Sequence, residues 1–127
     1  MYENSVTVTG SVIEDPEMIG EVLTFYIVNN PVYKDPETGE RKTKTVRHTV
    51  TVWQKSKEWL LENLKKGDKV YIRGTLAQRT VEDLLGNKKI ETVIKSNSVQ
   101  IIMSKVDKEI LRREKGESNY NREEFNI

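Results

Sequence analysis

Four stretches of this chain alternate between apolar and polar residues with a period of two, and this pattern constrains the fold more than any other feature. They are residues 5–13, 22–28, 45–53 and 68–78. Alternation of this kind is typical of half-buried strands, because successive side chains of a strand point to opposite faces. Residues 89–103 are predicted to add a final strand, or two, kinked near Ser96-Asn97-Ser98.

A helix interrupts the strands. Trp59, Leu60, Leu61 and Leu64 recur at helical spacing and Gly67 follows as a stop, which predicts a helix over residues 56–66. The order of three strands, one helix and two strands predicts an all-β fold: a five-stranded OB-fold barrel with one helix between strands 3 and 4. Ser104 and Asp107 have the spacing of a capping box, so a short C-terminal helix is expected over residues 104–116, with a polar tail beyond it.

Length and composition exclude several classes of protein. A chain of 127 residues is the usual size of one domain, and residues 1–103 are predicted to form it, with 104–127 as an extension. The absence of cysteine and the presence of only one histidine, His48, argue against thiolate metal sites, disulfides and Ser/His catalysis, so no metal or cofactor is expected. No apolar run is long enough to span a membrane and no leader is recognisable, which favours the cytoplasm.

The third predicted strand carries an unusual outward face, made of Arg47, Thr49, Thr51 and Trp53. A tryptophan among polar positions is hard to explain as core. The net charge is only +1, but residues 34–57 hold seven basic and three acidic residues, a local charge of +4. Exposed rings beside cations suit single-stranded nucleic acid, since bases stack on the rings and phosphates are drawn to the charges. Tyr26, Tyr33, Tyr71 and Arg73 could extend this surface.

Other interpretations of these residues remain open. Trp53 and Tyr71 could instead lie in a subunit interface, and His48 is expected in the core or an interface. Trp59 is expected in the core. Residues 29–44 are either a long loop or an extended hairpin. Carboxylates such as Asp15, Glu17 and Asp35 could hold a metal in a nuclease, but Asp15-Pro16-Glu17 is ordinary turn chemistry, so no enzyme is predicted.

Several motifs in series resemble the bacterial single-stranded DNA-binding proteins, over residues 4–103. They are Asn4-Ser5-Val6-Thr7-Val8-Thr9-Gly10 with Asp15-Pro16-Glu17, then Thr24-Phe25-Tyr26-Ile27-Val28-Asn29-Asn30, Thr38-Gly39-Glu40, Arg47-His48, and Lys65-Lys66-Gly67-Asp68-Lys69-Val70-Tyr71-Ile72-Arg73-Gly74-Thr75-Leu76. The resemblance implies an OB-fold homo-oligomer, with a tetramer favoured, that binds single-stranded DNA without sequence preference and protects it in replication, repair and recombination.

The resemblance also places functional residues. Trp53 and Tyr33 fall where the family has stacking aromatics. The charges of this chain, and not the resemblance, predict the phosphate contacts, which are Lys34, Lys44, Arg47, Lys55, Arg73 and Arg79. The chain departs from the family at Val81, where a third stacking aromatic is often found, and at Arg47, which replaces an aromatic. Its tail is short, but Glu123-Glu124-Phe125-Asn126-Ile127 keeps acidic residues before apolar ones, which suggests either a reduced tip for replication or repair partners or a frayed end. The main rival function is an OB-fold protein-interaction or primosome-type assembly factor.

Overall fold

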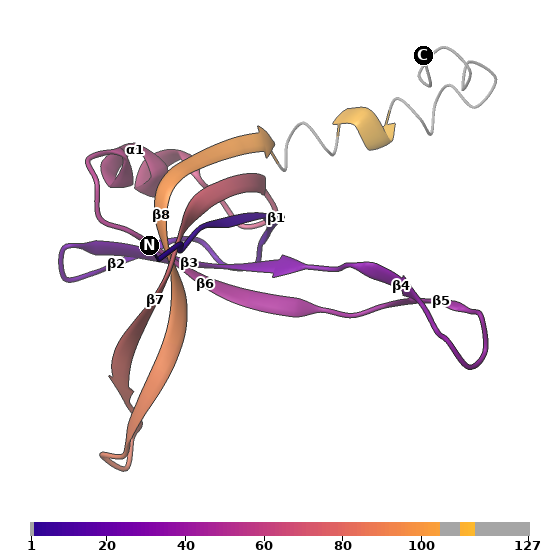
Figure 1. Ribbon diagram of the computed structural model, residues 1–127. Helices are drawn as coiled ribbons and strands as arrows, with labels where there is room; N and C mark the ends of the chain where they lie inside the picture. The colour runs from indigo at the N-terminus through magenta and orange to yellow at the C-terminus, as the bar shows by residue number, and fades with distance from the viewer. Residues whose placement is uncertain (1, 105–109, 114–127) are drawn as a thin grey trace.

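The computed structural model describes residues 2–104 and 110–113, and its centre is a ring-like sheet with one helix (Figure 1). In the main sheet the strand order is β1-β7-β8-β6-β3-β2, and a further pairing of β1 with β3 closes the ring. The elements are β1 (Val6–Val12), β2 (Glu17–Ile19), β3 (Val22–Asn29), β4 (Val32–Lys34), β5 (Arg41–Thr43), β6 (Val46–Val52), α1 (Ser56–Asn63), β7 (Lys69–Glu82) and β8 (Lys88–Met103). The predicted all-β barrel, with a helix between its third and fourth long strands, is confirmed.

The alternating residues fill the inside of the ring. Leu23, Phe25 and Ile27 of β3 face Val50 and Val52 of β6, and all five are essentially inaccessible to solvent. Val70 and Ile72 of β7 and Ile94 of β8 complete this core. The apolar positions of β3, β6 and the first part of β7 therefore point into the core, which is the reason the sequence alternates there.

Helix α1 covers one end of the barrel with few residues. Leu60 and Leu64 are buried, but Trp59 is 56% exposed, so the expectation that Trp59 belongs to the core is wrong. A helix of only two turns presents one narrow stripe to the barrel, which Leu60 occupies, and Leu64 is buried immediately after the helix ends. The helix ends at Asn63 rather than at residue 66, and Gly67 (φ +94°) lies in the turn that leads to β7.

A bulge in β8 explains how the two longest strands curve. Arg73 of β7 pairs with Ser98 and the next residue, Gly74, pairs with Ser96, so Asn97 is left without a partner on β7. The kink predicted near residues 96–98 is confirmed. Gly74 lies so close to the carbonyl oxygen of Lys95 that a Cβ at this position would overlap it. The bulge and the glycine together allow the strands to bend sharply here.

Two hairpins project from the barrel in different directions (Figure 1). One is the β4–β5 hairpin, which confirms an extended hairpin within residues 29–44. The other, here called the β7–β8 arm, consists of residues 75–95 beyond the bulge. Leu76, expected to face inward, lies at the root of this arm and is 51% exposed, because the pairing of β7 with β1 ends at Gly74.

The C-terminal part of the chain is described only in places. Residues 110–113 are helical, within the helix expected over residues 104–116. The rest of that helix beyond Ser104, and the tail with its Glu123–Ile127 tip, lie outside the described residues. Over residues 2–104 and 110–113, no helix has the length and apolar character that a membrane span requires.

Candidate nucleic-acid interface

Trp53 lies in a groove beside the β7–β8 arm. It follows the last residue of β6, on the outward face that the alternation predicts, and 56% of it is exposed. The groove has a volume of about 590 Å³ and a largely apolar floor. Among the residues that line it are Ile19, Thr24, Thr51, Trp53, Arg79, Val81 and Lys95, and it is called the Trp53 groove below. It therefore joins the two predicted site residues Trp53 and Arg79.

Cationic side chains flank the tryptophan. The Nζ atom of Lys95 lies 5.6 Å from the centroid of a Trp53 ring, within the range of a cation–π contact. Lys95 was not among the residues predicted from the sequence, because the irregular order of residues 89–103 did not reveal which side chains of β8 point outward. An open indole with a lysine and an arginine in the same groove can stack on a base and attract the neighbouring phosphates.

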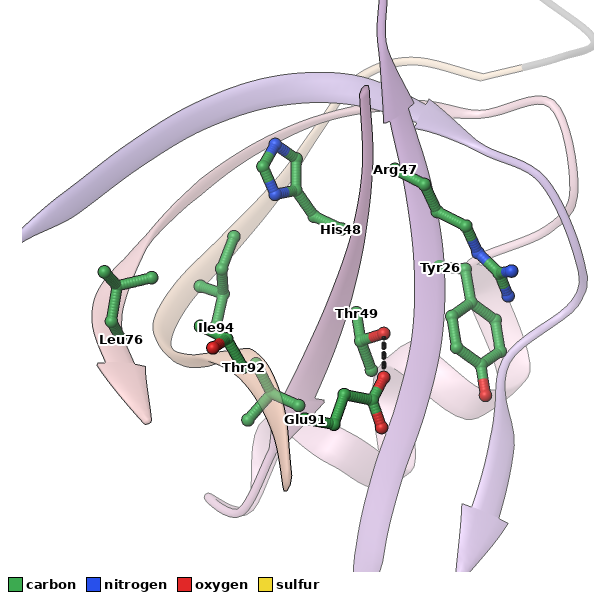
Figure 2. A pocket seen from close by; sticks show the side chains of 9 residues that line it. Tyr26, Arg47, His48, Thr49, Leu76, Glu91, Thr92 and Ile94 are labelled. Atoms are coloured by element: carbon green, nitrogen blue, oxygen red, sulfur yellow. Dashed lines mark hydrogen bonds between the residues drawn. The ribbon is translucent and has the colours of Figure 1, made fainter. Parts of the chain in front are cut away.

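A second groove lies at the root of the β7–β8 arm (Figure 2). It has a volume of about 490 Å³, shares Val93 with the Trp53 groove, and is called the Arg47 groove below. Its lining includes Tyr26, Arg47, His48, Thr49, Leu76 and Glu91. The Arg47 guanidinium carbon lies 4.4 Å from the centroid of the Tyr26 ring, so the cation is held over an aromatic face. Half-buried His48, expected in the core or an interface, lines this groove instead of being fully enclosed.

Glu91 is the acidic residue of the Arg47 groove. Its carboxylate accepts a hydrogen bond from the Thr49 hydroxyl at 2.8 Å and another from Arg79 Nε at 3.0 Å. Burial raises the pKa of Glu91, but these hydrogen bonds and the charges of Arg79 and Arg47 outweigh it, and the pKa lies below its ordinary value. The residue is therefore ionised at neutral pH, and it links the strand that carries Arg79 to the wall of the barrel.

The outward face of β6 is only partly open. Thr49 and Thr51 were expected to be exposed with Arg47 and Trp53, but they are 8% and 3% exposed. Strand β8 runs beside β6 here, and the Thr51 hydroxyl lies 3.5 Å from the carbonyl oxygen of Ile94. The arm thus covers the middle of the predicted face and leaves Arg47 and Trp53 accessible on either side.

The β4–β5 hairpin carries further predicted contacts. Tyr33 is 47% exposed and pairs across the hairpin with Lys42, while Lys34 pairs with Arg41. Asp35 forms an ion pair with Lys42 at 2.8 Å. This ion pair, and next the Glu37 backbone N–H, hold the pKa of Asp35 below its ordinary value. Lys44 follows β5 and is exposed.

The remaining predicted site residues lie elsewhere. Lys55 is exposed immediately before α1. Arg73 lies with Tyr71, Ser98, Gln100 and Ile102 around a depression of about 450 Å³ on the outer face of β7 and β8, which shares no lining residue with either groove. The Arg73 Nε donates a hydrogen bond to the Tyr71 hydroxyl at 3.1 Å. Within residues 2–104 and 110–113, no cluster of three His, Asp or Glu side chains is placed to hold a metal ion.

Comparisons with known proteins agree on one family. A family model described as "Single-strand binding protein family" matches residues 3–102. The chain is similar to "Single-stranded DNA-binding protein 1" of Xylella fastidiosa (strain 9a5c), with 29% identity in an alignment of 109 positions that covers 82% of this chain and 80% of that protein. It is also similar to a solved structure, "Plasmodium falciparum SSB complex with ssDNA", with a TM-score of 0.69 and 27% identity, over 81% of this chain and 96% of that one.

Proposed function

The chain belongs to the single-strand binding protein family and binds single-stranded DNA as a non-enzymatic member of it; we propose that the strand passes over the Trp53 and Arg47 grooves and onto the β4–β5 hairpin. In this proposal Trp53 and Tyr33 stack on bases. Lys34, Lys44, Arg47, Lys55 and Arg79 contact phosphates, and Lys95 joins them beside Trp53. Arg73, on the outer face of the sheet, would be reached only by DNA that wraps around the domain.

The surroundings of Trp53 are the observation that most strongly supports this path. The Trp53 side chain is open to solvent in an apolar groove, with Arg79 and Lys95 lining the same groove. A nucleic-acid base that stacks on the flat Trp53 ring brings its phosphate to these cations, so one groove offers both of the contacts that single-stranded DNA makes. Stacking tolerates every base, so binding without sequence preference follows from the same chemistry.

The wider role is also a proposal. Protein bound along the DNA would protect single strands exposed in DNA replication, repair and recombination, in the cytoplasm.

We propose that the protein works as a homo-oligomer, with a tetramer favoured. We also propose that the Glu123–Ile127 tip recruits replication or repair proteins. Deletion of residues 123–127 should then abolish capture of such partners while DNA affinity stays the same. Unchanged capture would exclude this role of the tip.

A fluorescence titration tests the binding path directly. Because Trp59 would add a second signal, the Trp59→Phe variant is titrated with an oligothymidine at two salt concentrations, and with duplex DNA as a control. We expect saturable quenching of Trp53 by the single strand, weaker at high salt and small or absent with the duplex. Tight binding without quenching would place the DNA away from Trp53. Absence of binding to either nucleic acid would favour the alternative, an OB-fold assembly factor that binds proteins.

A further inference from the structure

Glu91 occupies an unexpected place for an acidic residue, inside the interface proposed for a polyanion. It lines the Arg47 groove (Figure 2) with its side chain 31% exposed, and the residue directly opposite it in the β7–β8 ladder is Arg79. A carboxylate in this position repels a phosphate that approaches the same groove. The inference below rests on the proposed function.

Both carboxylate oxygens of Glu91 are engaged within the protein. One accepts the hydrogen bond from Thr49 and the other accepts the hydrogen bond from Arg79. Carboxylates and phosphates bind guanidinium groups by the same charge-assisted geometry. Glu91 therefore holds Arg79 Nε in the way that a phosphate would, so a DNA phosphate at Arg79 either replaces this contact or binds the Nη groups beside the Glu91 charge.

The charged residues that line the two grooves are Arg47, Arg79, Lys95 and Glu91. The three cations alone would supply three positive charges, but with the ionised Glu91 the net charge of the four is only +2. The Arg79–Glu91 pair is partly open, with side chains 29% and 31% exposed, so water and phosphate can both reach it. A partly exposed pair is exchangeable because its net stability is small.

From this arrangement we propose that Glu91 is an internal competitor of the DNA phosphates, which occupies Arg79, offsets Arg47 and so lowers the affinity of the protein for single strands. It is a positioning residue and not a phosphate ligand itself. The consequence is a DNA complex that releases its strand more readily than the aromatic and basic residues alone would allow.

The Glu91→Gln substitution isolates the charge. A glutamine side chain keeps the size of the residue and an oxygen that can accept the Thr49 hydrogen bond, so the arm should stay in place. We expect E91Q to bind an oligothymidine about two- to fivefold more tightly than the unchanged protein at low salt. Because Arg79 becomes available to a phosphate, log K should also fall more steeply with log salt, by up to roughly 0.7 in slope.

Glu82→Gln is the matched control, since Glu82 is an exposed acid on the same arm that lines neither groove. It should leave the affinity and the salt slope near those of the unchanged protein. An equal gain in E82Q would mean that overall charge, and not the position of Glu91, sets the affinity. An E91Q protein that is folded, as judged by its thermal midpoint, but binds no more tightly would overturn the inference. Failure of the unchanged protein to bind the oligonucleotide would instead contradict the proposed function.

Discussion

The two tryptophans offer an internal comparison, because both are 56% exposed and only their surroundings differ. Trp53 lies in a groove with Arg79 and Lys95, whereas Trp59 lies on α1 and lines none of the grooves described above. If exposure alone decided DNA binding, the two would be equivalent. If the groove decides it, only Trp53 matters.

We therefore expect Trp53→Ala to weaken the binding of single-stranded DNA by about 1–3 kcal/mol, which is the range for loss of one stacking platform. Trp59→Ala should change the affinity little. Fluorescence anisotropy of a labelled oligonucleotide measures both variants, and circular dichroism checks that each keeps the fold. Equal losses in the two variants would contradict the assignment of Trp53.

Individual residues of β3, β6 and β8 show what the sequence could and could not predict. The alternation in residues 22–28 and 45–53 predicts the buried face of β3 and β6, since that face depends only on the period of a strand. The burial of Thr49 and Thr51 could not be foreseen, because it depends on β8, a strand more than 40 residues away. The place of Glu91 could not be foreseen either, because its hydrogen bond with Thr49 depends on the position of β8 beside β6. The prediction of a buried Trp59 was wrong because the short helix and the residue after it supply more apolar side chains than the narrow contact with the barrel can bury.

At the scale of elements, the turn of the β7–β8 arm depends on one carboxylate. Asp83 accepts hydrogen bonds from the backbone N–H groups of Leu85 and Asn87 at 2.9 and 2.8 Å. The hydrogen bond from Asn87 is the main reason that the pKa of Asp83 lies below its ordinary value of 3.8. A lowered folded-state pKa means that this contribution is present above pH 3.8 and is lost as the pH falls through the folded pKa.

The amide signals of Leu85 and Asn87 in an NMR titration should therefore stay constant from neutral pH down to about pH 4 and shift only in more acidic solution. An Asp83→Asn variant keeps an acceptor oxygen but has no carboxylate, so its signals should not show this shift. A midpoint above pH 3.8 in the unchanged protein would contradict the lowered pKa.

The curvature of the arm depends on Gly74 at the bulge. A Cβ there would overlap the backbone of Lys95 and Ser96, and neither can yield without breaking the ladder. We expect Gly74→Ala to lower the free energy of unfolding by about 3 kcal/mol, at the upper end of ordinary overpacking, as measured by urea denaturation. Gly20→Ala is the control, because a Cβ at Gly20 meets nothing within 4 Å and only its positive φ of 64° is unfavourable. A smaller loss at Gly74 than at Gly20 would mean that the bulge can relax.

At the scale of the whole molecule, the surfaces of the barrel have different characters. The Trp53 and Arg47 grooves carry the aromatics and cations proposed to hold DNA. The depression on the outer face of β7 and β8 combines the exposed side chain of Ile102 with the rings and polar groups of Tyr71, Arg73 and Gln100. An apolar side chain exposed among groups that can pair with a copy of themselves is typical of a symmetric contact between subunits, and in such a contact Arg73 would not be open to DNA.

This surface gives the proposed oligomer a specific test. Sedimentation equilibrium should give a mass near four times that of the 14.8 kDa chain at the concentrations used for DNA binding. Ile102→Glu should shift the mass to smaller species, because a carboxylate in a subunit contact loses its water without gaining a partner. An equivalent change at exposed Ile90, on the arm and outside this depression, should leave the mass unchanged. A single-chain mass for the unchanged protein would exclude the oligomer, and a full-size oligomer in Ile102→Glu would place the subunit contact on another face.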